Sequence, residues 1–361
     1  MSSFNIDKFV RPHLKDLVPY SSARDDFKGA ASVYLDANEN PFDNGLNRYP
    51  DPHQSELKKV LSRIKNIPAQ NIFIGNGSDE AIDLLFRAFC EPGKDNIITL
   101  PPTYGMYKVS AKINNVVVKE VLLDEFFDID VEKTIAAIDP STKLIFLCSP
   151  NNPTGNSLSR AAIKKILASF NGLVVVDEAY IDFSSLPSLT EWIQEFRNLV
   201  VLQTLSKAWG LASARIGLCL ASEPVVNVLN KIKPPYNISG PDQQQALQAL
   251  GNEISMKERV EQIKTQREWL NNELKQNSES WVLGSIHPEA NFSVGLRSLN
   301  ANRNPINFLS ECWHKLGGTQ SKKTKLPKTV LPNYIWHQKR KKPPSSFLKP
   351  KRRLAKKIFS L

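Results

Sequence analysis

The chain has 361 residues, of which 41% are hydrophobic, and this is enough for one large domain and a smaller one. No apolar run approaches the roughly 20 residues that a membrane-spanning helix needs, so the composition indicates a soluble globular protein. The formal net charge is +11, but residues 291–361 hold 17 Lys and Arg against one acid, whereas residues 1–290 hold 30 bases and 35 acids. The body of the chain is mildly acidic, and the total charge therefore does not indicate nucleic-acid binding.

The N-terminal residues and the cysteines indicate the cellular compartment. The opening residues, MSSFNIDKFVRPHLKD, have neither the basic nor the apolar region of a signal peptide. The four cysteines lack the pairing of a metal site: Cys90, Cys148, Cys219 and Cys312. We expect a cytoplasmic protein with reduced thiols and no metal ligands.

Apolar runs alternate with helical patterns along the body of the chain, which predicts βα units and a largely parallel sheet. Residues 79–90 place Ile82, Leu85 and Phe89 on one helical face, residues 160–170 show the same spacing, and residues 256–276 indicate one long charged helix. The predicted strands are 96–100, 116–121, 144–148, 173–176, 198–202 and 216–220.

Three loops follow predicted strands and carry chemically active side chains. Their sequences are SPNNPTG at 149–155, DEAY at 177–180 and QTLSKAWG at 203–210. Ligands bind at the carboxyl ends of the strands in parallel sheets. We therefore expect the three loops to converge on one crevice.

The side chains of these loops suit pyridoxal phosphate, because a lysine amine forms a Schiff base with its aldehyde and a carboxylate keeps its pyridine nitrogen protonated. Asp177 follows a Val-rich strand and should be buried, where a carboxylate needs a cationic partner such as a pyridinium. Asn152 and Tyr180 would hydrogen-bond the phenolic oxygen of the ring. Ser206 and Arg215 would bind the phosphate.

A second element with the features of a phosphate site is FIGNGSDEAIDLLFRAF, residues 73–89. Glycines at positions 75 and 77 allow close backbone approach, and Ser78 is predicted to cap a helix whose N–H groups and dipole favour an anion. Taken alone, the same pattern is typical of an ordinary helix start.

Several motifs in order resemble a known family. NPTG, VVVDEAY and SKAWGLASARIG are similar to the fold-type I pyridoxal-phosphate-dependent aminotransferases. VRPHLKDLVPYSSAR, LDANENPFDN and NRYPDP resemble the arm and substrate-side loops of the histidinol-phosphate aminotransferase branch. The resemblance runs from about Val10 to about Phe292.

The resemblance implies a role for each matching residue around the cofactor ring. Lys207 is implied to be the catalytic residue that anchors the aldehyde and moves the proton at the substrate Cα. Asp177 is implied to pair with the pyridine nitrogen, Tyr180 and Asn152 to hold the phenolic oxygen, and Tyr104 to stack on the ring face.

The phosphate and substrate contacts are implied in the same way. Gly77, Ser78 and Asp79 present the helix start to the phosphate, which Ser206 and Arg215 also bind. The implied contacts outside this group are Tyr49, which reaches the phosphate from the neighbouring subunit of a homodimer, and Tyr20 and Asn38 on the substrate side.

The implied α/β fold has a large domain, with a mostly parallel sheet flanked by helices, and a smaller α/β domain built from the N-terminal arm and the C-terminal part. We expect residues 1–40 to form the arm and a small-domain segment, and residues 41–240 the large cofactor-binding domain. Residues 241–292 would begin the small C-terminal domain, and residues 293–361 form a basic, atypical tail.

The implied reaction is transamination of L-histidinol phosphate with 2-oxoglutarate, giving imidazole acetol phosphate and glutamate in histidine biosynthesis. The expected partners are these small molecules and a second copy of the chain, with no membrane or nucleic acid. The alternatives are a related aromatic amino-acid aminotransferase, a pyridoxal-phosphate decarboxylase, or a catalytically impaired copy that retains the cofactor.

The tail departs from the family pattern, which has an apolar strand and an arginine near its end. One interpretation is a shifted reading frame beginning shortly after Phe292. The others are a basic extension that binds phosphate groups and a solvated disordered tail. Because the predicted cofactor-binding residues all precede position 220, we expect cofactor binding to persist and turnover to be weak or absent.

Overall fold

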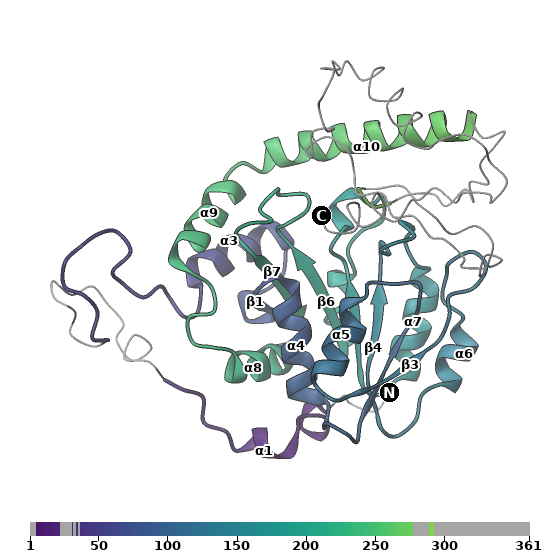
Figure 1. Cartoon of the computed structure of the whole chain (residues 1–361), viewed down its shortest axis with the longest axis horizontal. Helices are drawn as coiled ribbons and strands as arrows, with labels where there is room; N and C mark the ends of the chain where they lie inside the picture. The colour runs from purple at the N-terminus through teal and green to yellow at the C-terminus, as the bar shows by residue number, and fades with distance from the viewer. Residues whose placement is uncertain (1–4, 22–30, 32–33, 35–36, 277–288, 292–361) are drawn as a thin grey trace, which may run out of the picture.

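The computed structural model describes residues 5–21, 31, 34, 37–276 and 289–291 (Figure 1). The predicted tail at 293–361, with Cys312, lies outside the described residues. The described residues form a seven-stranded sheet in the order β1-β7-β6-β5-β4-β2-β3. Its strands are β1 (Ile72–Asn76), β2 (Asn96–Thr99), β3 (Val117–Glu120), β4 (Thr142–Cys148), β5 (Leu173–Asp177), β6 (Leu199–Thr204) and β7 (Ile216–Ala221).

The prediction of a mostly parallel sheet is confirmed. The pairs β2–β3, β2–β4, β4–β5 and β5–β6 are parallel, whereas β7 runs antiparallel to both of its neighbours, β1 and β6. All six predicted strands are present. Strand β1 was not among them, because its sequence IFIGN has only three apolar residues before a glycine and no parallel βα unit requires it.

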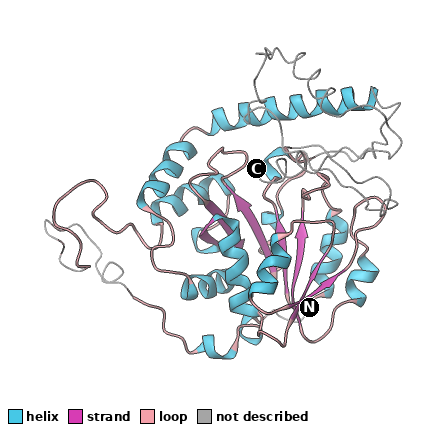
Figure 2. Ribbon diagram, viewed as in Figure 1, coloured by secondary structure: helices cyan, strands magenta, loops and turns pink. Residues whose placement is uncertain are grey.

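Helices cover both faces of the sheet (Figures 1 and 2). The hydrophobic core on one face includes residues of α4, α5 and α8, and the core on the other includes residues of α3, α7, α9 and the first part of α10. The helices are α1 (Pro12–Lys15), α3 (Ser55–Lys65), α4 (Gly77–Phe89), α5 (Met106–Ile113), α6 (Val131–Ala136), α7 (Arg160–Ser169), α8 (Glu223–Ile232), α9 (Gly240–Leu250) and α10 (Glu253–Gln276), with short 3-10 helices η1 (Ile6–Lys8), η2 (Ala69–Asn71), η3 (Ile181–Phe183) and η4 (Leu189–Trp192).

The central strands β4, β5 and β6 each contain a run of apolar residues because they are buried on both sides. In β5, Val174 and Val176 pack into one core, and Leu173 and Val175 pack into the opposite one. This follows from the alternation of side chains along a strand and explains why a run of valines forms a strand between two helical layers. Only the last residue of β5, Asp177, is charged.

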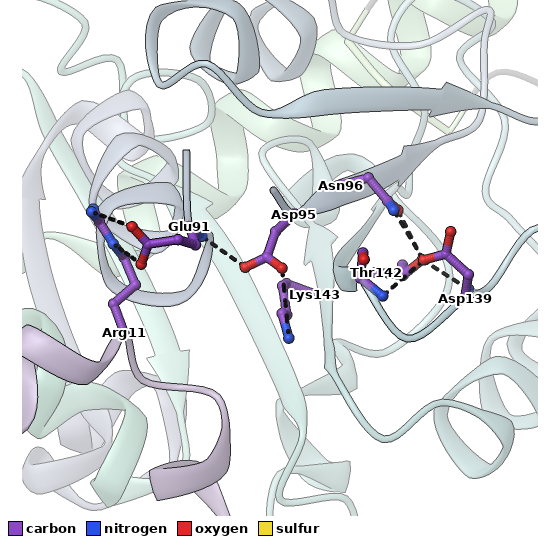
Figure 3. Close-up of polar contacts among 8 residues, drawn as sticks. Arg11, Glu91, Asp95, Asn96, Asp139, Thr142 and Lys143 are labelled. Carbon is purple, nitrogen blue, oxygen red and sulfur yellow. Dashed lines mark hydrogen bonds and ion pairs between the residues drawn. The ribbon is translucent and has the colours of Figure 1, made fainter. Parts of the chain in front are cut away.

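A polar network joins the N-terminal segment to the amino ends of β2 and β4 (Figure 3). The Arg11 guanidinium donates to the Glu91 carboxylate at 3.3 and 3.4 Å, and the Glu91 backbone N–H donates to Asp95 Oδ2 at 2.7 Å. Beside Asp95, the Asn96 amide donates to Asp139 Oδ1 at 3.0 Å. These bonds lie at the amino ends of the parallel strands, on the opposite side of the sheet from their carboxyl ends.

Helix α10 extends from the sheet as 24 mainly polar residues. It carries charged side chains along much of its length, which agrees with the long charged helix predicted at 256–276. Across the described ranges, no helix combines the length and the apolarity that crossing a bilayer demands.

Candidate active site

The loops after β4, β5 and β6 meet at one cavity of about 200 Å³, at the carboxyl ends of these strands. The start of α4 forms a further wall. The predicted convergence of the three loops is therefore confirmed. The predicted site residues that line this cavity are Gly77, Ser78, Asp79, Tyr104, Asn152, Asp177, Tyr180, Ser206, Lys207 and Arg215.

Asp177 is the buried charged group of the cavity. It ends β5, and only 3% of it is exposed. Its Oδ1 accepts from the Ala179 backbone N–H at 3.0 Å, and its Oδ2 accepts from the Tyr107 hydroxyl at 2.8 Å. Burial raises the pKa of the Asp177 carboxyl above its ordinary value, and these two hydrogen bonds oppose that rise.

Lys207 lines the same cavity, near Tyr180. Its Nζ is 5.4 Å from the centroid of the Tyr180 ring. The Asn152 side-chain amide donates to the Tyr180 hydroxyl at 3.5 Å, and burial raises the pKa of that hydroxyl. An amine, a phenol and an amide therefore face the same space as the buried carboxylate.

The start of α4 differs from the sequence prediction. Ser78 was predicted to cap this helix, but the helix begins at Gly77, its N-cap is Asn76, and Ser78 lies within the first turn. The helix therefore begins two residues earlier than a Ser78 cap would allow. At its first residue, Gly77, the backbone has a left-handed φ of +72°, and the N–H donates to the Arg215 carbonyl at 2.6 Å. First-turn N–H groups have no acceptor within their helix, so this end of the cavity suits an anion.

Arg215 and Asp79 flank this helix start as a half-exposed ion pair. Arg215 Nη2 lies 3.4 Å from Asp79 Oδ2, and the Tyr104 hydroxyl donates to Asp79 Oδ1 at 3.2 Å. A Cβ on Gly77 would lie 2.7 Å from Arg215 Nη2. The lack of a side chain at Gly77 thus allows the Arg215 guanidinium to lie next to the backbone without a clash.

Gly217 of β7 has no side chain, and this allows the backbone at the start of α4 to pack directly against it. A Cβ there would lie 2.1 Å from the Ser78 nitrogen and 2.2 Å from the Gly77 carbonyl carbon. Because both atoms belong to the backbone, the turn itself would have to move.

We expect Gly217→Ala to destabilise the protein by about 1–3 kcal/mol and to weaken anion binding at the α4 start, because overpacking displaces the backbone. Urea unfolding of the variant measures the first effect. The matched control is Gly105→Ala, since no atom lies within 4 Å of a Cβ there. Equal unfolding midpoints for the two variants would contradict this interpretation.

The two asparagines of the NNPTG loop have different roles: Asn151 is structural, and Asn152 lines the cavity. Asn151 is buried and donates to the Pro102 carbonyl at 2.9 Å and to Thr154 Oγ1 at 2.7 Å, while it accepts from Thr103 Oγ1 at 3.0 Å. These bonds fix the loop and leave Asn152 to line the cavity.

Three predicted site residues do not line the cavity. Tyr49 is 51% exposed and stacks on Tyr236 with 4.5 Å between ring centroids. Tyr20 is 75% exposed. Asn38 is also exposed and has a φ of +52°. The fold of a single chain thus does not bring these side chains to the lysine.

Four residues of the site region were not among the predicted site residues: Ala179, Cys148, Thr204 and Tyr107. Cys148 and Thr204 line the cavity, and each is the last residue of its strand, β4 and β6. Thr204 already lies in the predicted loop at 203–210, and the rule that led to the three loops would have found Cys148 if it had included the final strand residue. Tyr107 was missed because an aromatic residue on a helix usually indicates core packing, although PPTYGMY places it three residues after Tyr104.

The fold and this cavity agree with comparisons to known proteins. The chain belongs to the class I and II aminotransferases, whose family model matches residues 30–298. Within that family it is similar to histidinol-phosphate aminotransferases. It is 49% identical to the enzyme of that name from Bacteroides thetaiotaomicron, over 87% of this chain and 95% of that protein, and 54% identical to the one from Flavobacterium johnsoniae, over 81% and 84%.

A solved structure extends the comparison to the fold. The histidinol-phosphate aminotransferase from Sinorhizobium meliloti, crystallised in complex with pyridoxal-5'-phosphate, matches with a TM-score of 0.60 and 26% identity, over 64% of each chain. The seven-stranded sheet flanked by helices is therefore that of the fold-type I aminotransferases.

Proposed function

We propose that the protein is a pyridoxal-phosphate-dependent aminotransferase that acts on L-histidinol phosphate. The amino group passes to 2-oxoglutarate, and the products are imidazole acetol phosphate and glutamate. The observation that carries the proposal is one cavity that holds the Lys207 amine, the buried Asp177 carboxylate and the start of α4, in a chain about half identical to histidinol-phosphate aminotransferases.

The donor set of the cavity fits pyridoxal phosphate. Both hydrogen-bond donors to Asp177 in the described part of the chain are neutral groups, so this buried carboxylate suits a ring nitrogen that carries a proton. Near the α4 start, Ser78, Ser206 and Arg215 would hold the phosphate group. A lysine amine, a carboxylate and an anion-binding helix start are the three features that this cofactor requires.

When bound, the cofactor supplies a protonated aromatic ring that accepts the electrons of the substrate Cα–H bond. Asp177 would hold the proton on the ring nitrogen, and Asn152 and Tyr180 would bind the phenolic oxygen. Tyr104 would pack on the ring face, and Gly77 and Asp79 would complete the phosphate end.

Lys207 is the proposed catalytic residue. Its Nζ would hold the aldehyde carbon between turnovers and would take the proton from the substrate Cα during each of them. The amine is suited to both tasks because it enters the cavity from the loop after β6, with the Tyr180 ring beside it.

The proposal includes a homodimer in the cytoplasm. Tyr49 would reach the phosphate of the partner subunit, and Tyr20 and Asn38 would face the substrate. The exposure of Tyr49 and Tyr20 supports this, as does that of the apolar side chains of Val18, Phe42 and Leu46 on the same N-terminal stretch.

The proposal also includes the division of the chain into domains at residues 40, 240 and 292. The residues from Gly77 to Arg215 that line the cavity all fall in the proposed large domain. The residues after 298 lie beyond the match to the family model.

A single half-reaction tests the proposed function. Mixing the cofactor-loaded protein with L-histidinol phosphate, without any 2-oxo acid, should change the visible spectrum of the cofactor, and 2-oxoglutarate should restore it. We expect the rate to be low, because the tail at 293–361 departs from the family pattern. We expect kcat/KM for this donor to exceed that for phenylalanine or tyrosine by at least roughly tenfold, because the substrate pocket discriminates between side chains. Faster reaction with the aromatic amino acids, or release of carbon dioxide from them, would contradict the substrate assignment.

A further inference from the structure

Tyr107 lies behind Asp177, outside the wall of the cavity. It is the second residue of α5 and is fully buried. Its ring stacks on Phe146, with 4.7 Å between centroids and 19° between planes, and meets Tyr104 edge-on at 5.5 Å. Two aromatic contacts therefore fix the direction in which its hydroxyl points.

That hydroxyl donates to Asp177 Oδ2 at 2.8 Å, while the Ala179 N–H donates to Oδ1 at 3.0 Å. With one donor on each oxygen, the plane of the carboxylate is set by the protein. The two donors differ in origin, because Ala179 belongs to the loop that follows β5, whereas Tyr107 comes from another element, α5.

We propose that Tyr107 is a positioning residue for the cofactor, and that its hydroxyl holds Asp177 as an oriented anion facing the cavity. The inference rests on the proposed function, since it assigns Asp177 to the ring nitrogen. Tyr107 itself would touch neither cofactor nor substrate and would act through the carboxylate.

The electrostatic surroundings explain why such a donor matters. Burial and the like charge of Asp79 raise the pKa of Asp177, whereas Tyr107, the Ala179 N–H and the Lys207 charge lower it. The titratable groups that face Asp177 come from α4, α5, β4 and the flanking loops: Asp79, Tyr107, Cys148, Tyr104, Tyr180 and Lys207. Among these, Tyr107 is the side chain that donates a hydrogen bond to the carboxylate.

Removal of the Tyr107 hydroxyl should raise the pKa of Asp177 further. The anion would lose a hydrogen-bond donor, so the neutral carboxyl would become more favourable relative to it. If the ring nitrogen needs the anion, the affinity for the cofactor would fall at neutral pH. It would fall further as the pH drops, because a larger fraction of Asp177 would then be protonated.

The experiment is a titration of the apoprotein with pyridoxal phosphate, followed by equilibrium dialysis at a series of pH values. We expect Tyr107→Phe, which keeps the ring and its stacking, to raise the Kd roughly ten- to a hundredfold, the range for hydrogen bonds to charged groups. The pH below which binding is lost should move upward relative to the wild type.

A double-mutant cycle separates this role from simple packing. In an Asp177→Asn background, where no anion remains to be held, adding Tyr107→Phe should change the Kd by less than about twofold. An equal effect in both backgrounds would overturn the proposal, as would a Tyr107→Phe protein with wild-type Kd and pH dependence. A wild-type protein that does not bind pyridoxal phosphate would instead overturn the proposed function.

A second replacement covers the case in which Tyr107→Phe does not fold. A ring-fluorinated tyrosine at position 107 keeps the shape of the side chain and makes its hydroxyl a stronger donor. It should lower the Kd and move the loss of binding to lower pH. Unchanged binding with the fluorinated residue would contradict the role of the hydroxyl.

Discussion

Lys207→Ala is expected to lower the rate of the half-reaction with L-histidinol phosphate by at least roughly a thousandfold, since the variant loses both the group that holds the aldehyde and the base at the substrate Cα. The visible absorbance of the bound cofactor should disappear together with turnover. Stopped-flow spectroscopy with the donor alone measures both.

Lys164→Ala is the matched control for this variant. Lys164 lies on α7 and its amine forms an ion pair with Glu195 at 2.9 Å, away from the cavity. The control should keep the wild-type spectrum and rate. If Lys207→Ala retained turnover above a tenth of the wild-type rate, the assignment of Lys207 would be wrong.

Asp177→Asn is expected to lower the half-reaction rate about a hundred- to a thousandfold, the cost of removing one preorganised electrostatic contact to the reacting system. The same variant should leave the apoprotein folded. An asparagine can still accept from the Ala179 N–H through its oxygen, and its amide can donate to the Tyr107 hydroxyl. Packing and hydrogen bonding therefore persist while the charge is lost.

The stability of the wild-type apoprotein should depend on pH through Asp177. In the folded protein, burial raises the pKa of this carboxyl from its ordinary value of 3.8. The stabilising contribution of the protonated carboxyl is therefore fully present below pH 3.8 and is lost as the pH rises through the folded pKa. Asp177→Asn should therefore melt a few degrees higher than the wild type at neutral pH, and the difference should vanish below about pH 4. A variant that is less stable than the wild type at neutral pH would contradict the burial argument.

Much of the fold could be predicted because its strands carry a strong physical signal. A strand such as β5 is buried on both faces, so nearly every residue in it is apolar, and the sequence LVVVD also marks where it ends. Strand β1 was missed because its glycine and asparagine serve the helix start that follows, and these residues weaken the strand pattern. The antiparallel direction of β7 depends on long-range pairing with β1 and β6, which no local pattern encodes.

The cavity residues were predictable to a similar degree. Asn152, Asp177 and Lys207 follow or end strands, so the rule for ligand sites in parallel sheets applies to them directly. Tyr107 reaches Asp177 from a helix that begins about 70 residues earlier in the chain, and only the folded arrangement reveals that contact. The start of α4 depends on a bond from Gly77 to Arg215, which is also a long-range contact.

The central claim is that one amine of this chain holds the aldehyde of pyridoxal phosphate. Borohydride reduction of the purified wild-type protein, followed by peptide mass mapping, tests it most directly. The account predicts a single peptide that carries the added mass of the reduced cofactor, with the modification on Lys207. No added mass, or a modification on another lysine such as Lys58, would contradict it.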